Sequence, residues 1–360
     1  MNKYIFFCCS LLITLLSFSQ NKFGNQKVFL ITLDGLRWQE LFSGADPLLV
    51  KNKKYVKDPE KLLEWTWNEK PKDRRKMLMP FIWNEVVNIG QIYGNRNLGN
   101  KVNLTNSMWF SYPGYNEILT GRADDENIFS NDKIPNSNET ILEQFAKAFN
   151  SSKVAAFASW DVFDYIINQE RSGVYTNCGF ESSTDFPLSK KEILLNDLQS
   201  QTPSPWSSVR FDGFTHQYAK IYLDKHQPDL LYISYGETDD FAHDGDYESY
   251  LKSTKNTDSL IKDLWEYTQQ SDYYKGKTTF IITTDHGRGT EPIESWKSHG
   301  ADIKGSDQTW IILFGKGVSG KGEISEPNQL FSNQIAPTIR ELLGISKYYT
   351  SGYGDPLKLR

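Results

Sequence analysis

Three of the five histidines lie beside aspartate or glycine, in arrangements that are typical of metal ligands. They occur in Asp239-x3-His243, in Asp285-His286-Gly287 and in Ser298-His299-Gly300. Imidazole nitrogen and carboxylate oxygen bind zinc, and a catalytic zinc site keeps one position open for substrate. A spacing of four also occurs by chance on one face of a solvated helix. The three segments in combination, rather than the first pair alone, therefore predict a metal centre.

Ser111 is the candidate nucleophile. It precedes Pro113, which suits the first turn of a helix because the missing N–H is not needed there. This placement puts the Ser111 hydroxyl at the positive, amide-rich end of the helix, where a phosphate or an alkoxide is stabilised. Serine is also a preferred N-cap residue, so a purely structural role is the alternative.

The elements that must position these residues follow from alternating apolar and amphipathic segments. Buried strands are predicted at 28–33, 154–158, 230–235, 279–284 and 310–314, and helices at 141–149, 211–225 and 247–269. His216 and His226 lie in or at the end of one helical segment and are interpreted as structural. The alternation predicts an α/β fold in which helices sandwich a mostly parallel central sheet.

Polar clusters follow three of the predicted strands. Asp34 ends the first, residues 236–240 follow another, and Asp285 with His286 terminates a third. In such sheets the side chains at the carboxyl ends of strands emerge into a common crevice. We therefore expect the three clusters to meet at one edge of the sheet.

The composition is that of a globular protein without a basic surface. The 360 residues are 38% hydrophobic and 24% charged, which is enough to bury a large core. Lys and Arg number 40 against 45 Asp and Glu, a net charge of −5, so no positive field favours nucleic acid as a specific partner. The aromatic content of 14% favours a cleft-bearing protein that handles carbohydrates or esters.

Two stretches interrupt the α/β rhythm. Residues 43–76 are polar and rich in lysine and are interpreted as a lid-like insertion. Residues 171–208 are rich in Ser, Thr and Pro and are expected to loop over the surface. No repeat or linker divides the chain, so one domain over residues 20–360 with inserted cap segments is favoured over two domains.

The first 19 residues have the pattern of a secretory signal peptide. Lys3 precedes an apolar run from 4 to 16, and Ser17-Phe18-Ser19 supplies a small-x-small cleavage site. The run is shorter than the roughly 20 residues that a helix needs to cross a bilayer. Cys8 and Cys9 lie inside the run, which disfavours lipid attachment. We expect an exported protein, periplasmic or secreted, without membrane insertion after cleavage.

Cleavage leaves Cys178 as the single cysteine, so no intramolecular disulfide can form. Residues 175–179 contain no histidine that would activate a thiol, and Cys178 is interpreted as a structural or surface thiol.

The motifs, taken in order, resemble those of the alkaline phosphatase superfamily, and within it the type I phosphodiesterase/nucleotide pyrophosphatase-like branch. They are Leu33-Asp34-Gly35, Ser111-x-Pro113 followed by Leu119-Thr120-Gly121, Asp239-x3-His243, Thr284-Asp285-His286-Gly287, His299-Gly300, and Gln334–Ile339 with Leu342-Leu343-Gly344. The resemblance spans most of the chain after the leader. It implies the fold of that superfamily and a two-zinc hydrolase of phosphomono- or phosphodiesters.

By this resemblance, Asp239, His243 and His299 hold one zinc ion, and Asp34, Asp285, His286 and Ser111 hold the second. Two divalent ions about 4 Å apart clamp the attacking and leaving oxygens of an in-line phosphoryl transfer. One ion makes the Ser111 hydroxyl an alkoxide that attacks phosphorus, and the other stabilises the departing oxygen. A phosphoseryl intermediate forms, and water then releases phosphate.

Family members also place an asparagine downstream of the nucleophile against a phosphoryl oxygen. Asn131 is the candidate here, although Asp132 occupies the position that the spacing predicts. The Lys-x-Arg pair of phosphate-monoester specialists is missing from the comparable stretch, residues 156–163. A monoester dianion needs more positive charge, so this absence favours diesters. Arg37 and Arg122 are alternative phosphate contacts.

Four aromatic residues, Trp109, Phe110, Tyr112 and Tyr115, surround the nucleophile in the sequence. They predict a stacking wall for a nucleobase or an aromatic leaving group, with core packing as the alternative for at least two of them.

Three other functions stay open. A sulfatase shares the sheet but requires arginine where Tyr115 stands, and it uses one oxygen-rich calcium site. A phosphotransferase or mutase would pass the phosphoryl group from Ser111 to an alcohol. A non-catalytic, metal-stabilised binding protein would keep zinc without turnover. The expected partner is a small-molecule phosphate ester, and the sequence leaves the oligomeric state open.

Overall fold

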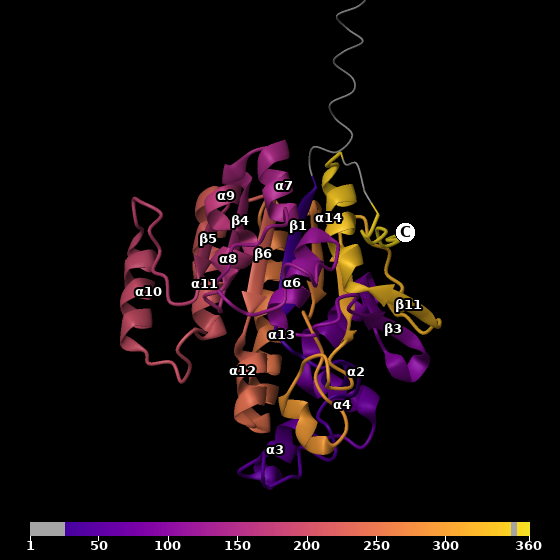
Figure 1. Cartoon of the computed structure of the whole chain (residues 1–360). Coiled ribbons are helices and arrows are strands. Elements are labelled where there is room, and N and C mark those ends of the chain that lie inside the picture. Colours follow the sequence, from indigo (N-terminus) through magenta and orange to yellow (C-terminus); the bar gives the residue numbers. More distant parts are fainter. Residues whose placement is uncertain (1–25, 347–350) are drawn as a thin grey trace, which may run out of the picture.

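The computed structural model describes residues 26–346 and 351–360. The expected signal peptide, with Cys8 and Cys9, lies outside these residues. The described chain places helices on both faces of a central eight-stranded sheet, with a three-stranded sheet beside it (Figure 1). This arrangement confirms the α/β fold that the alternating segments predict.

The central sheet has the strand order β10-β2-β9-β7-β1-β6-β4-β5. Its strands are β1 (Lys27–Leu33), β2 (Gly90–Tyr93), β4 (Val154–Ala158), β5 (Tyr175–Cys178), β6 (Leu230–Tyr235), β7 (Thr278–Thr283), β9 (Ile311–Gly315) and β10 (Gly322–Glu323). Neighbouring strands are parallel, except that β9 runs antiparallel to both β7 and β2. The small sheet consists of β3 (Asn100–Asn103), β8 (Gln308–Thr309) and β11 (Asn328–Phe331).

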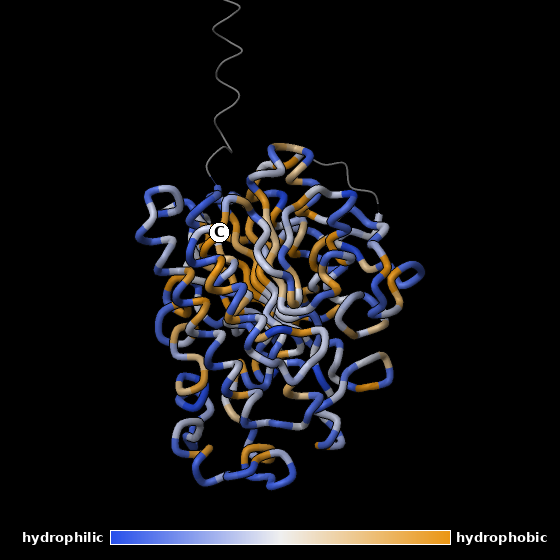
Figure 2. The backbone as a smooth tube through the Cα atoms, turned by 90° about the vertical axis from the view of Figure 1, so that its left-hand side faces the viewer, coloured by the Kyte–Doolittle hydropathy of each residue, from blue (hydrophilic) through white to orange (hydrophobic). Residues whose placement is uncertain are grey.

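The two faces of β1 pack against different helices, because alternate side chains of a strand point to opposite faces. The helices concerned are α6 (Ser111–Thr120), α7 (Ile141–Ala148), α11 (Asp212–His226), α13 (Tyr247–Gln270) and α14 (Ile335–Leu343). Phe29 and Ile31 share a core with α11 and α13, whereas Val28 and Leu30 share a second core with α6, α7 and α14. Figure 2 shows the apolar strands gathered in the interior. Burial on both faces explains the continuous apolar runs of these strands.

The remaining helices lie around this core. They are α2 (Trp38–Ser43), α3 (Pro59–Thr66), α4 (Pro71–Leu78), α5 (Val87–Ile89), α8 (Phe163–Ile167), α9 (Gln169–Ser172), α10 (Lys190–Gln201) and α12 (Glu237–Asp244), with the π-helical turn η1 (Ile82–Val86) and the 3-10 turns η2 (Arg96–Leu98), η3 (Ser151–Lys153), η4 (Ile293–Lys297) and η5 (Ser332–Gln334). Within the described ranges, no helix combines the length and the apolar character needed to span a bilayer.

The two irregular stretches contain more regular structure than the sequence predicts. Residues 43–76 hold α3 and α4, and α4 packs against α2 at the lower end of the molecule in Figure 1. The expectation that residues 171–208 form a surface loop is wrong, because they contain the edge strand β5 and helix α10. Ser189 and Glu192 form a capping box at the start of α10, so local polar contacts define this helix.

A buried carboxylate joins α13 to the helical segment that begins near Phe81. Asp258 of α13 accepts hydrogen bonds from the backbone N–H groups of Phe81, at 2.8 Å, and Ile82, at 3.0 Å. Burial raises the pKa of the Asp258 carboxyl to about 7 from its ordinary 3.8. The folded protein therefore keeps a proton that the unfolded chain loses, and the stability from this group is complete below pH 3.8 and lost as the pH rises through about 7.

The Asp258→Asn variant is expected to lose this pH dependence. In the wild-type protein the group contributes a fall in the free energy of unfolding with rising pH, with a slope of at most about 1.4 kcal/mol per pH unit. Urea unfolding at a series of pH values measures the slope. The exposed Asp272→Asn change is the matched control and should keep the wild-type slope. Equal slopes in wild type and Asp258→Asn would contradict the expectation.

Candidate metal centre and nucleophile

Three strand ends bring the predicted ligands to one edge of the sheet. Asp34 follows β1, α12 follows β6, and Asp285 comes shortly after β7. The parallel pairing of β1 with both β6 and β7 aligns these ends. Backbone contacts continue the alignment: the Asp34 N–H donates to the Tyr235 carbonyl at 2.9 Å, and the Gly35 N–H donates to Asp285 Oδ1 at 3.0 Å. The three polar clusters therefore meet at one edge of the sheet, as expected for side chains that follow the carboxyl ends of parallel strands.

The cluster at the nucleophile consists of Asp34, Asp285, His286 and Ser111, all of them buried. His286 Nε2 lies 3.4 Å from Asp34 Oδ1 and 3.5 Å from Asp285 Oδ2. The same nitrogen lies 3.3 Å from Ser111 Oγ. The other ring nitrogen of His286, Nδ1, faces the Gly287 carbonyl oxygen at 2.9 Å. This backbone contact orients the ring so that Nε2 is directed at the cluster.

The second cluster consists of Asp239, His243 and His299. Asp239 and His243 lie one turn apart on α12, with His243 Nε2 3.1 Å from Asp239 Oδ2. His299 follows η4, and its Nε2 lies 3.0 Å from His243 Nε2 and 3.7 Å from Asp239 Oδ1. His286 joins the two clusters, because its Nε2 lies 3.7 Å from Asp239 Oδ1 and its ring stacks on His299 at 3.9 Å between centroids.

The donor set of these clusters fits divalent cations. Asp34 Oδ1, Asp285 Oδ2 and His299 Nδ1 are buried atoms without a hydrogen-bond partner among the described residues. Burial, followed by the charges of neighbouring carboxylates, raises the pKa of both Asp34 and Asp285. A bound cation would satisfy the carboxylate oxygens and offset their mutual repulsion. In each of two groups the ligand atoms lie within 4.8 Å of one another: Asp34, Asp285 and His286, and Asp239, His286 and His299.

Ser111 is the first residue of α6 and does not cap it. Phe110 occupies the N-cap position, and its own side chain makes no capping hydrogen bond. The Ser111 hydroxyl instead lies against His286 Nε2 in the cluster described above. Of the two roles that the sequence leaves open for Ser111, the geometry matches the one at the metal cluster, at the helix terminus where an oxyanion is stabilised.

Asn131 lies at the same terminus of α6. Its Oδ1 accepts a hydrogen bond from the backbone N–H of Tyr112 at 2.9 Å, which fixes the carboxamide beside the residue that follows the nucleophile. Since the oxygen is engaged, the Nδ2 group of this exposed side chain is the donor left for a ligand. The structure thus brings Asn131 next to the predicted site, and its contact with substrate stays a prediction.

Arg288 is a charged residue at the site that the sequence motifs did not single out. It is buried, and its Nη1 group bonds Asp239 Oδ1. Its Nε donates to the Trp296 carbonyl at 2.9 Å, and its Nη2 donates to the Lys297 carbonyl at 2.7 Å. One guanidinium therefore ties Asp239 to the turn that carries His299. Its position directly after Asp285-His286-Gly287 was the available sequence signal.

Gly35 is required by this packing. It has a φ of +58°, and a Cβ atom there would lie 2.6 Å from Arg288 Nη1 and 2.7 Å from Asp239 Oδ1. Glycine therefore permits both the left-handed turn after Asp34 and the close approach of the guanidinium.

Glu117 is a second residue that the motifs did not identify. This buried carboxylate of α6 accepts hydrogen bonds from the backbone N–H groups of Thr105, Asn106 and Asn333, at distances from 2.9 to 3.1 Å. Asn106 Oδ1 in turn accepts from the N–H of Trp109 at 3.0 Å. Trp109 has a φ of 54°, a conformation that costs energy in a non-glycine residue. The network holds this strained turn two residues before the nucleophile.

The expected aromatic wall is only half present. Tyr112 and Tyr115 are buried, and the Tyr115 hydroxyl donates to Asp34 Oδ2 at 2.8 Å. These two residues pack in the core, which is the alternative that the sequence left open, and they offer no face to a substrate. Trp109 and Phe110, which directly precede Ser111, are partly exposed.

The two alternative phosphate-contacting arginines, Arg37 and Arg122, both bond other protein groups. Arg37 is buried and bonds the Glu40 carboxylate through Nε at 2.9 Å and through Nη2. Arg122 follows the opposite end of α6 from Ser111, and its Nη2 bonds Asn138. Each guanidinium therefore has a protein partner, and contact of either arginine with substrate stays a prediction. His216 lies away from the cluster, with Nδ1 2.9 Å from the Tyr235 hydroxyl and Nε2 2.8 Å from Asp263, as a structural histidine would.

Comparison with known proteins gives one family match. Residues 213–347, which include α12 and the segments of His286 and His299, match the model of the Metalloenzyme superfamily. No curated protein matches the sequence.

Solved structures share the fold over most of the chain. Alkaline phosphatase PafA superposes with a TM-score of 0.56 at 12% identity, covering 94% of this chain and 99% of that one. The 2-O GAG sulfatase BT1596 gives a TM-score of 0.56 at 12% identity, covering 92% of this chain and 73% of its own. The lipoteichoic acid synthase LtaP from Listeria monocytogenes gives 0.54 at 12% identity, covering 92% and 74%. The metalloenzyme model matches residues 213–347, and the solved structures share the fold over most of the chain; both findings agree with the resemblance of the motifs to the alkaline phosphatase superfamily.

Proposed function

We propose that the chain is an exported phosphoric-ester hydrolase that uses two zinc ions and forms a phosphoseryl intermediate at Ser111. Proteins that share this fold include an alkaline phosphatase and a sulfatase, and residues 213–347 match a metalloenzyme model, so these similarities favour a metal-dependent hydrolase. The observation that carries the finer proposal is the 3.3 Å contact between Ser111 Oγ and His286 Nε2, inside a cluster of buried carboxylates that lack partners among the described residues.

Two sets of residues would hold the metal. Asp34, Asp285 and His286 would bind one zinc together with Ser111, and Asp239, His243 and His299 would bind the other. When bound, zinc would supply the positive charge that favours an ionised Ser111 hydroxyl and stabilises oxygen atoms that gain negative charge. The carboxylates and imidazoles of both sets suit zinc better than the oxygen-rich site typical of calcium.

The chain's own groups would carry the reaction in two displacements. Ser111 Oγ attacks phosphorus, the bond from phosphorus to the leaving oxygen breaks, and the alcohol departs as the Oγ–P bond forms. Water then attacks the same phosphorus, the Oγ–P bond breaks, and Ser111 regains its proton as phosphate, or the remaining monoester, is released. The N-terminus of α6 and the Nδ2 group of Asn131 would stabilise the phosphoryl oxygens in both steps.

The residue at position 115 supports phosphate over sulfate esters. Formylglycine-dependent sulfatases need an arginine there, whereas Tyr115 is buried and bonds Asp34. The missing Lys-x-Arg pair further favours diesters, or monoesters held by a differently built pocket, because a dianionic ester needs additional positive charge.

Three aryl esters compared side by side test the proposal. The protein beginning near Gln20 should cleave p-nitrophenyl phosphate or bis-p-nitrophenyl phosphate, should leave p-nitrophenyl sulfate intact, and should contain two zinc ions per chain by elemental analysis. Added alcohol acceptors should not divert the product from phosphate, which separates hydrolysis from phosphotransfer. Cleavage of the sulfate ester alone would reject the proposal, and zinc content without turnover of any ester would support a binding protein instead.

A further inference from the structure

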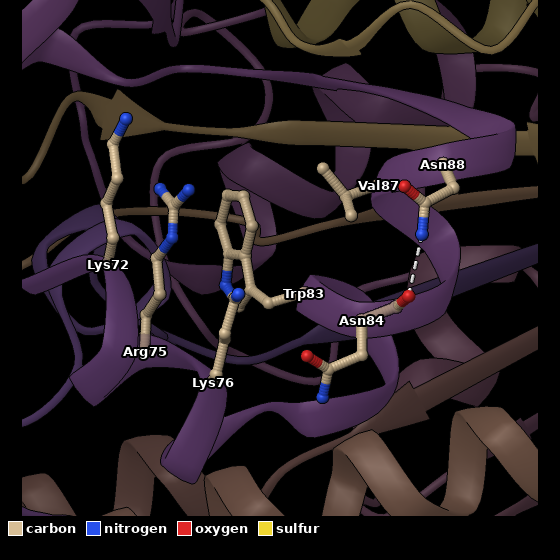
Figure 3. Close-up of a pocket in the computed structure, with 7 residues that line it drawn as sticks. All are labelled: Lys72, Arg75, Lys76, Trp83, Asn84, Val87 and Asn88. Carbon is tan, nitrogen blue, oxygen red and sulfur yellow. Dashed lines mark hydrogen bonds between the residues drawn. The ribbon is translucent and has the colours of Figure 1, made fainter.

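A cavity of about 330 Å³ lies on the helical hairpin formed by α4 and the η1–α5 segment. Seven residues line it: Lys72, Arg75 and Lys76 from α4, and Trp83, Asn84, Val87 and Asn88 from the facing segment (Figure 3). We call it the hairpin pocket. None of the predicted metal ligands lines it, so it is distinct from the centre at Ser111. Its volume is at the lower end of the range for small-molecule sites.

A fixed stack forms the floor of the hairpin pocket. The Arg75 guanidinium carbon lies 3.4 Å from the centroid of the Trp83 ring. The same guanidinium makes two hydrogen bonds to the Glu323 carboxylate, at 2.7 and 2.9 Å, and Trp83 Nε1 donates to the Leu41 carbonyl at 2.9 Å. Glu323 thus matches the charge of Arg75, and the pair is held in place before any ligand arrives.

Two lysines at the rim add positive charge without a direct ion pair, although Lys72 also acts on the Glu323 carboxylate at longer range. Lys72 and Lys76 are exposed and lie one turn apart on α4, where like charges repel each other. Among the described residues, neither ammonium lies within 4.0 Å of a carboxylate. The surrounding segment strengthens this field: residues 51–76 contain ten Lys and Arg against five Asp and Glu, in a chain whose total is 40 against 45. The hairpin pocket therefore attracts an anion.

The opposite wall of the hairpin pocket presents carboxamides. Asn88 Nδ2 donates to the Asn84 carbonyl at 2.7 Å, the contact drawn in Figure 3, which leaves Asn88 Oδ1 as an acceptor. The exposed Asn84 carboxamide supplies both a donor and an acceptor. Such a wall suits hydroxyl groups, which also both donate and accept. Cationic groups on one side and carboxamides on the other match a ligand that combines an oxyanion with hydroxyls.

We propose that the hairpin pocket binds a sugar or polyol that carries a phosphate or sulfate group, with the oxyanion between Lys72 and Lys76 and the hydroxyls against Asn84 and Asn88. Lysine ammonium groups donate charge-assisted hydrogen bonds to tetrahedral oxyanions, and the floor of Arg75 and Trp83 sets the depth of the site. This binding does not depend on the reaction proposed at Ser111.

Calorimetric titration with glucose 6-phosphate, glucose 6-sulfate, inorganic phosphate and glucose tests the site. The protein carries Ser111→Ala so that no ester is consumed at the nucleophile. Both substituted sugars are expected to bind more tightly than phosphate or glucose. Adding Lys72→Ala and Lys76→Ala should weaken their binding by at least tenfold, whereas Lys190→Ala with Lys191→Ala, which removes the same charge from the exposed start of α10, should not. Replacing Asn84 and Asn88 by alanine should remove the preference for substituted sugars over phosphate.

Several results would overturn the proposal. Absence of binding, or equal affinity in the Lys72/Lys76 double variant, would reject the hairpin pocket as the site. Equal affinities for phosphate and both substituted sugars would reject the role of the hydroxyls. Loss of binding in His299→Ala, but not in the double lysine variant, would place the ligand at the metal centre. Because the readout is binding, failure of hydrolysis in the aryl-ester assays would leave the hairpin pocket standing, and the reverse also holds.

Discussion

Replacing Ser111 by alanine is expected to lower kcat for aryl phosphate esters by roughly 10³-fold or more, the scale seen when a nucleophile is removed. The reason is that Ser111 Oγ is the hydroxyl that faces His286 Nε2 in the carboxylate cluster, so the substitution removes the proposed attacking oxygen. Steady-state kinetics on p-nitrophenyl phosphate and its bis-ester measure the loss. Circular dichroism would show that the fold is retained.

Two further variants make the test of Ser111 specific. Ser111→Thr keeps a hydroxyl at the start of α6 and should retain measurable turnover. Ser107→Ala removes an exposed serine whose hydroxyl bonds Asp125, and it should leave kcat unchanged. A Ser111→Ala protein with wild-type kcat would remove the phosphoseryl mechanism, whatever its metal content.

Removal of metal is expected to abolish ester hydrolysis and to destabilise the fold. Without cations, Asp34 Oδ1 and Asp285 Oδ2 are buried oxygens without hydrogen-bond partners among the described residues, and their carboxylates repel each other. At a free zinc concentration one thousand times Kd, binding adds about 4 kcal/mol to the free energy of unfolding for each site. Calorimetric melting with and without a chelator measures this loss, and zinc should restore both stability and turnover.

Two histidine variants show whether the loss of activity comes from the proposed metal centre or from an unspecific effect of the chelator. His299→Ala removes a ligand of the second cluster and should lower the zinc content from two ions to one. His226→Ala is the matched control, since His226 bonds Asp185 away from both clusters. Full turnover in metal-free wild-type protein, or loss of zinc in both variants alike, would contradict the two-zinc assignment.

The strands of the sheet could be predicted because their signal is local. The predicted strands 154–158 and 230–235 agree with β4 and β6 residue for residue, since both are short apolar runs buried on two faces. The meeting of Asp34, Asp239 and Asp285 followed from the same reasoning, because parallel strands end at a common edge. Elements without a clear apolar pattern were not predicted. Strand β5 has only four residues, and helix α10 begins at a polar capping box.

The parts of the site that could not be predicted depend on contacts between distant residues. Arg288 bonds the carbonyl groups of Trp296 and Lys297 and the Asp239 carboxylate. The spacing of these residues along the chain does not predict the contacts. Arg37 follows the Asp34 motif closely, and its guanidinium bonds the Glu40 carboxylate, a contact that the sequence motifs do not reveal. The binding partner of a charged side chain can be predicted only when all the oppositely charged groups near it in the fold are known.

The burial of Cys178 makes its thiol a probe for local opening at the edge of the sheet. This thiol ends β5, the outermost strand on its side of the sheet, and burial raises its pKa well above the usual range. Alkylating reagents react with the thiolate form of cysteine. In a chain beginning near Gln20, Cys178 should therefore be alkylated only when local unfolding separates β5 from β4. The rate of Cys178 alkylation would then report how often β5 opens, and this measurement does not require enzymatic activity.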